Sequence, residues 1–86
     1  SPFVTAVYDN TDFDYVPAAE LTRLGNKICN GWAAGMSVDD MSLSVVSGMT
    51  EGKGGEPLTE KEIRDGAYVI FASTNFLCPE YLPTDS

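Results

Sequence analysis

Residues 59–79, TEKEIRDGAYVIFASTNFLCP, decide the fold of this chain because they combine a helix start, a long apolar run and a helix stop. Thr59, followed three residues later by Glu62, has the pattern of a capping box, in which each side chain accepts a hydrogen bond from the other residue's backbone amide. The thirteen residues that end at Cys78 carry no charge, and Pro79 cannot continue a helix. The stretch therefore predicts a final helix that is apolar almost all round and lies at the centre of the domain.

Within this final helix, one set of residues recurs at spacings of three and four and is expected to face the core. The set consists of Ile63, Ala67, Ile70, Phe71, Thr74 and Leu77. Three further residues broaden this face, namely Tyr68, Val69 and Phe76.

Two further helices are predicted in the first half of the chain. Ser1-Pro2 places a capping hydroxyl before a proline at the first helical position, so a short helix is expected to end near Asp9-Asn10. A second helix begins at Pro17, and Gly35 is well placed to end it. Its apolar stripe consists of Leu21, Leu24, Ile28 and Trp32, while Arg23 and Lys27 lie on its exposed side.

A third long helix is predicted to open at Ser37, which is a favourable N-cap residue followed by two acids that suit the positive end of the helix dipole. Its apolar stripe consists of Val38, Met41, Val45 and Met49, and Gly48 marks its expected end. The remaining segments predict loops at about 9–16 and 50–58 and a short acidic tail at 79–86. The sequence thus predicts one all-α domain over residues 1–86, a small helical bundle of three main helices and a short N-terminal one.

The two cysteines lie in the two most hydrophobic segments of the chain. Cys29 falls within the second predicted helix and Cys78 at the end of the last one. If they join, they close a loop of about 50 residues, which contributes on the order of 4 kcal/mol in the chain-entropy model, and they imply an oxidising compartment. The alternative is a pair of buried free thiols, which are common in cytosolic proteins.

The charge of the chain argues against several classes of partner. The net charge is −8, with thirteen acidic residues against five basic ones. Such a surface repels a phosphate backbone, so nucleic-acid binding is not expected, and anionic membrane surfaces are disfavoured for the same reason. The longest uncharged stretch is also shorter than the about 20 residues that a membrane-spanning helix requires.

The residue inventory offers no catalytic or metal site. Histidine is absent, which excludes serine–histidine–aspartate triads and cysteine–histidine pairs, and two cysteines without histidine cannot form a structural zinc site. Asp9, Asp12 and Asp14 resemble a calcium cluster, but read from Asp9 the central glycine of an EF-hand is missing, and read from Asp12 the twelfth position is Arg23. We therefore expect a protein that is not an enzyme and has no catalytic residues, metal or cofactor.

The chain resembles the domain-of-unknown-function family 732. The likeness is carried by three short motifs that together cover roughly residues 3–82: Gly25-Asn26-Lys27-Ile28-Cys29, Gly35-Met36-Ser37 with Asp39-Asp40, and Phe76-Leu77-Cys78-Pro79-Glu80-Tyr81-Leu82. Members are small, mostly exported proteins of mycobacteria and related actinobacteria, and some occur in their phages. The resemblance implies that Cys29 and Cys78 form a disulfide between the second and last helices of a small helical bundle. It supplies no mechanism, because the family has no assigned activity.

Two functions are compatible with these observations. The first is an exported, non-catalytic protein-interaction module, secreted or in the cell envelope after removal of a signal peptide that these residues do not contain, with an unidentified partner and oligomeric state. The second is a carrier of a small apolar ligand or lipid, suggested by the wide apolar face of the last helix and by Met41 and Met49, because methionine adapts to irregular partners. A cavity between helices would favour the second function.

Overall fold

The computed structural model describes residues 1–82. In that range its regular elements are all helices, and it has no strands. Four α-helices, α1 (Pro2–Asn10), α2 (Ala18–Ala33), α3 (Val38–Gly52) and α4 (Glu60–Leu77), are accompanied by 3-10 turns at Phe13–Tyr15 and Pro79–Tyr81. This confirms the predicted all-α fold with one short and three longer helices. The last four residues of the predicted tail lie outside the described part of the chain.

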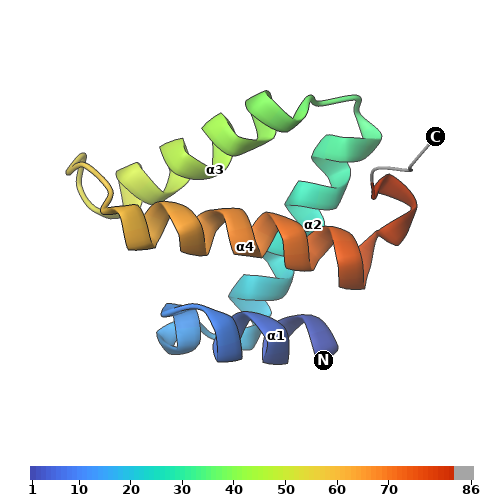
Figure 1. The fold of residues 1–86 in the computed structure, drawn as a ribbon, viewed down its shortest axis with the longest axis horizontal. Helices are drawn as coiled ribbons and strands as arrows, with labels where there is room; N and C mark the ends of the chain where they lie inside the picture. Colours follow the sequence, from blue (N-terminus) through green and yellow to red (C-terminus); the bar gives the residue numbers. More distant parts are fainter. Residues whose placement is uncertain (83–86) are drawn as a thin grey trace.

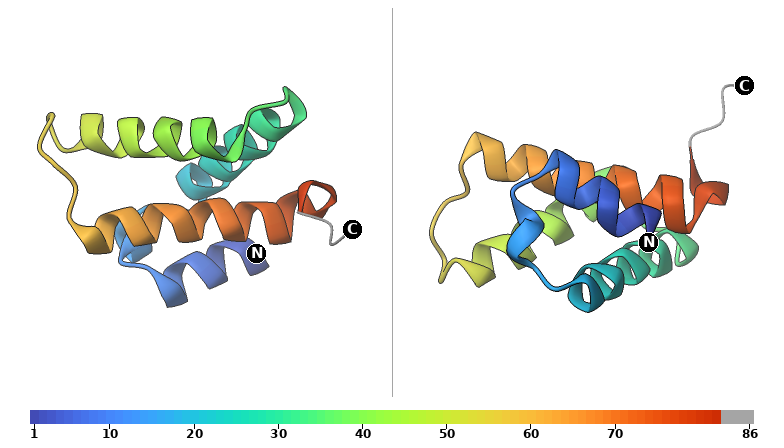
Figure 2. Two further views of the ribbon diagram at one scale, coloured as in Figure 1. Left: turned by 45° about the horizontal axis from the view of Figure 1, so that its top comes forward. Right: turned by 90° about the horizontal axis from the view of Figure 1, so that it is seen from below.

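Helix α4 lies at the centre of the arrangement, as the sequence predicted. Figure 1 and the left panel of Figure 2 show α1 and α3 on opposite sides of α4, both antiparallel to it. Helix α2 crosses behind α4 and also contacts α1, whereas α2 and α3 diverge from their connecting turn and make little direct contact. The domain is thus built around one shared helix rather than as an up-and-down bundle.

The core joins residues from all four helices. Its fully buried apolar members are Phe3, Val4, Val7, Leu21, Ile28, Met41, Val69 and Ala72. Phe3 and Val7 of the short α1 are completely inaccessible to solvent, which explains why this two-and-a-half-turn helix forms although isolated helices of that length are marginal in water.

Two of the three predicted caps are confirmed, whereas Ser1 is the N-cap of α1 but its hydroxyl makes no capping hydrogen bond. The Ser37 side chain accepts a hydrogen bond from the Asp40 amide. The capping box at α4 has both of its bonds, because the Thr59 hydroxyl accepts from the Glu62 amide and the Glu62 carboxylate accepts from the Thr59 amide. Gly35 follows α2 with a φ of 87°, a backbone conformation that favours glycine.

Two loop boundaries differ from the prediction. Helix α3 continues through Gly48 to Gly52, because the chain around Gly48 is open to solvent and a single glycine weakens a helix by only about 1 kcal/mol. The loop therefore starts at Lys53, whose ammonium donates to the Glu62 carboxylate and to the Pro57 carbonyl and so fixes the loop to the start of α4. In the earlier loop, residues 9 and 10 still belong to α1 and residues 13–15 form a 3-10 turn.

The predicted inward face of α4 is confirmed only in part, since Val69 and Thr74 are buried and Ile70 and Leu77 pack against the core. Ile63, Ala67 and Phe71 are exposed, whereas the buried residues of this helix are Asp65, Gly66, Val69, Ala72, Ser73 and Thr74. Three helices approach α4, and small side chains allow that approach. The hydroxyls of Ser73 and Thr74 are satisfied within α4, since they donate to the carbonyls four residues earlier.

Two residues of the other predicted stripes are also exposed. Val38 at the start of α3 is 68% exposed, whereas Met41 in the same turn is buried against Gly31 of α2. Leu24 of α2 is 36% exposed, since α2 and α3 diverge on that side. Leu21, Ile28 and Met41 occupy the buried positions that the sequence predicted.

Candidate functional site

The disulfide fixes α2 to the end of α4. Cys29 lies on α2 and Cys78 is the residue that directly follows α4, and their sulfur atoms are 2.07 Å apart with Cα atoms 6.0 Å apart. Both sulfurs lie 3.7–3.8 Å from the carbonyl oxygen of Ser73. Because disulfide sulfurs carry no hydrogen, these are packing contacts. The structure therefore brings together the two cysteines that the family resemblance paired.

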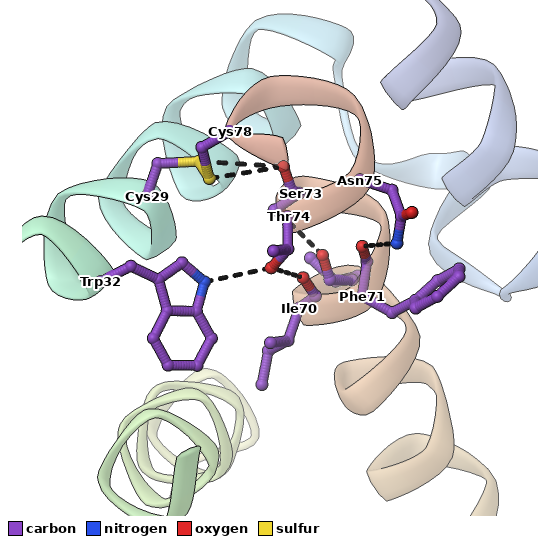
Figure 3. Close-up of a disulfide and its surroundings, with 9 residues drawn as sticks. Cys29, Trp32, Ile70, Phe71, Ser73, Thr74, Asn75 and Cys78 are labelled. Carbon is purple, nitrogen blue, oxygen red and sulfur yellow. Dashed lines mark hydrogen bonds between the residues drawn. A yellow bond between two sulfur atoms is a disulfide. The ribbon is translucent and has the colours of Figure 1, made fainter. Parts of the chain in front are cut away.

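A second link joins the same two helices one turn away. The indole nitrogen of Trp32 donates to the Thr74 hydroxyl at 3.0 Å, and Thr74 in turn donates to the Ile70 carbonyl (Figure 3). Trp32 is half-buried and packs against the core, as the sequence predicted. With the disulfide, this hydrogen bond sets the position of α2 on α4.

A buried carboxylate ties the first loop to α4. Asp65 is 4% exposed, and its two oxygens accept hydrogen bonds from the Asp12 amide at 3.1 Å and from the Lys61 ammonium at 2.6 Å. Asp12 takes part through its backbone amide and through an ion pair of its side chain with the Lys61 ammonium at 3.7 Å. Within residues 1–82, no group of three or more acidic or cysteine side chains is arranged to hold a metal ion.

A groove of about 490 Å³ lies between α2 and α3. Its apolar lining consists of Leu24, Ile28, Met36, Met41, Val45 and Met49. Two glycines and two polar residues complete the lining, namely Gly31, Gly48, Ser44 and Lys27. The volume lies within the range of roughly 300–1,000 Å³ that is typical of small-molecule sites, which are also mostly apolar with a few polar groups.

The floor of the groove is formed by flexible methionine side chains packed on glycines. A Cβ atom at Gly31 would lie 2.7 Å from the Met41 terminal methyl and 3.5 Å from the Met36 sulfur. At Gly66 of α4, a Cβ would lie 2.8 Å from the Met49 sulfur. Because methionine has three rotatable bonds and a polarizable sulfur, this lining can adapt its shape to a ligand.

The sequence predicted only part of this site. It pointed to Met41 and Met49 as adaptable groups, but it missed the contributions of Leu24 and Met36. The signal that could have revealed the groove is the set of small residues on the facing sides of α2 and α3, namely Gly31, Ser44 and Gly48. Small side chains on two diverging helices leave a hollow that the longer ones line.

The fold and its staple define a small all-α domain with one disulfide. The chain belongs to the family described as "Protein of unknown function (DUF732)", whose profile matches residues 1–80. This match confirms the resemblance seen in the three sequence motifs. Comparisons with curated proteins and with solved structures gave no match. In the described part of the chain, no helix combines the length and apolar character needed to cross a membrane.

Proposed function

We propose that this protein is an exported, non-catalytic binding domain that takes a small apolar ligand into the groove between α2 and α3. The observation that carries the proposal is the groove itself, which has six apolar lining residues, no carboxylate and a volume of about 490 Å³. The lack of histidine throughout the chain supports a binding role rather than a catalytic one. The Cys29–Cys78 disulfide is compatible with an oxidising compartment outside the cytosol.

Calorimetric titration with a neutral apolar probe, dodecanol, tests this proposal directly. A leucine at Ser44, which lines the groove, should fill it and abolish binding. Ser47→Leu is the matched control, because Ser47 is also exposed on α3 but does not line the groove. Native mass spectrometry should show one probe molecule on the wild-type protein and on Ser47→Leu, and none on Ser44→Leu. Equal binding by both variants would contradict the proposal.

A second candidate function is protein interaction through the exposed face of α4. Ile63, Ala67 and Phe71 lie four residues apart on one face, and Ile63 and Phe71 are 47% and 55% exposed. The Phe71 ring is supported by Tyr68, since their ring centroids are 5.7 Å apart. Aromatic and aliphatic residues presented on one helix face are typical of protein-interaction surfaces.

Capture of proteins from cell-envelope and secreted fractions tests this second candidate. Wild-type protein is expected to retain a partner that Phe71→Gln loses. Phe76→Gln is the matched control, because Phe76 is 48% exposed but points to another side of the same helix. A partner retained by both variants, or lost by both, would show that the exposed face of α4 is not the binding surface.

A further inference from the structure

The rim of the groove is positively charged although the whole chain has a net charge of −8. Lys27 lines the groove and also borders a smaller adjoining hollow of about 230 Å³, which is lined in addition by Arg23 and Glu20. Arg23 and Lys27 are one helical turn apart, so their side chains are neighbours on the surface of α2. Across residues 1–82, neither has a carboxylate oxygen within 4 Å. Both charges are therefore available to an anion.

Two lysines of the chain, in contrast, form ion pairs. Lys53 is engaged by Glu62, and Lys61 is engaged by Asp65 and Asp12. Lys27 in the groove and Arg23 in the adjoining hollow are two of the three basic side chains that make no ion pair among the described residues, the third being Arg64 on α4. An apolar groove with two free cations at one edge is complementary to a molecule that has an apolar body and one negative end.

We infer that the ligand of the groove is a long-chain carboxylate of the fatty-acid type, an inference that rests on the function proposed above. The acyl chain lies among Met36, Met41 and Met49, and the carboxylate meets Lys27 and Arg23. A water molecule occupies about 30 Å³ in the liquid and a methylene group is similar in size, so a groove of about 490 Å³ accommodates one chain of at most roughly sixteen carbons.

The charge of the lining favours an anion over a cation. None of the ten residues that line the groove is acidic, and Glu20 in the adjoining hollow is outnumbered by Arg23 and Lys27. The Ser44 hydroxyl offers a hydrogen-bond donor on the opposite wall. A charge-assisted hydrogen bond from Lys27 is expected to favour the carboxylate over a neutral head group about tenfold.

The experiment compares three probes that share one chain and differ only in the head group: dodecanoate, dodecanol and dodecyltrimethylammonium. Titration calorimetry, below the micellar concentrations of the two charged probes and the solubility limit of dodecanol, should give the wild-type protein about tenfold higher affinity for dodecanoate than for dodecanol, and the weakest binding for the cation. The preference should decrease as salt is added, because exposed charges are screened. Lys27→Gln and Arg23→Gln should each weaken dodecanoate binding by a larger factor than dodecanol binding.

Arg64→Gln is the matched control, because it changes the net charge by the same amount at an exposed position of α4 outside the groove. It should leave the affinities for both probes unchanged. Equal affinity of the wild-type protein for dodecanoate and dodecanol, or equal loss in Arg64→Gln and Lys27→Gln, would overturn the head-group inference while leaving the groove as a binding site. Failure of dodecanoate and dodecanol alike would instead refute the proposed function.

Discussion

Adding one methyl group at Gly25 should test how closely α2 packs on its neighbours. In the native structure, a Cβ at this position would lie 2.6 Å from the Leu77 Cδ1 atom and 3.0–3.1 Å from two ring carbons of Phe3. The Leu77 tip can rotate away, but Phe3 is completely buried. Its ring can yield only if α1 shifts, and overpacking of this kind typically costs about 1–3 kcal/mol.

The substitution also carries an intrinsic benefit, since alanine favours a helix over glycine by about 1 kcal/mol. Gly48→Ala provides the matched control, because Gly48 also lies inside a helix and a Cβ there has no neighbour within 4 Å. The gain in helix propensity is common to both variants, so the difference between their free energies of unfolding reports packing alone. We expect Gly48→Ala to be stabilised by about 0.5–1 kcal/mol and Gly25→Ala to be less stable than Gly48→Ala by about 2 kcal/mol.

Urea unfolding followed by far-ultraviolet circular dichroism, with the disulfide intact, measures both free energies. For a domain of this size, a difference of about 2 kcal/mol corresponds to roughly 8–16 °C in Tm, which a thermal scan resolves easily. If the two variants agree within about 0.5 kcal/mol, well below the usual cost of overpacking, the contact between α2 and the Phe3 ring is looser than described here.

Three further predictions concern the staple and the charged contacts. Replacing both Cys29 and Cys78 with alanine should lower the free energy of unfolding by about 4 kcal/mol, and urea midpoints close to those of the oxidised wild type would contradict this. Asp65→Ala should cost about 1–3 kcal/mol in the same assay, because it leaves the partners of a buried carboxylate unsatisfied, and an unchanged midpoint would count against it. The hydrogen bond from Lys53 and the backbone amide at the cap lower the pKa of Glu62 from 4.5 to about 2. The stabilisation by the Glu62 carboxylate is therefore present above pH 4.5 and is lost as the pH falls through about 2. The Tm advantage of wild type over Glu62→Gln should decrease over that interval, and an advantage that is undiminished at pH 2 would refute the assignment.

The helix starts and stops could be predicted because they depend on neighbouring residues alone. Ser37 and Thr59 cap their helices through amides three residues away, and Pro79 ends α4 whatever packs around it. The end of α3 was misplaced because Gly48 is only weakly unfavourable in a helix. It acts as a stop only where the surrounding chain offers an alternative, and here the helix continues to Gly52.

The inward face of α4 could be predicted only in part, because a helix that is apolar almost all round gives little indication of which side faces the core. Hydrophobicity favoured Ile63 and Phe71, whereas the structure buries Gly66 and Ser73. Which residues of α4 are buried depends on how closely the neighbouring helices approach. At Gly66, for example, a Cβ atom would lie only 2.8 Å from the Met49 sulfur. Which residues must be small depends on those neighbours, and the local pattern of α4 does not encode them.

The groove follows from the way in which α2 and α3 are anchored. Helix α2 is held on α4 by the disulfide and by the hydrogen bond from Trp32 to Thr74. Helix α3 is held on the same helix further towards its start, where Val45 and Met49 pack at Gly66. Each helix is positioned mainly by α4, and the contact between them is limited to their connecting turn and to the packing of Met41 on Gly31 (Figure 1). The space between them is a consequence of the central helix.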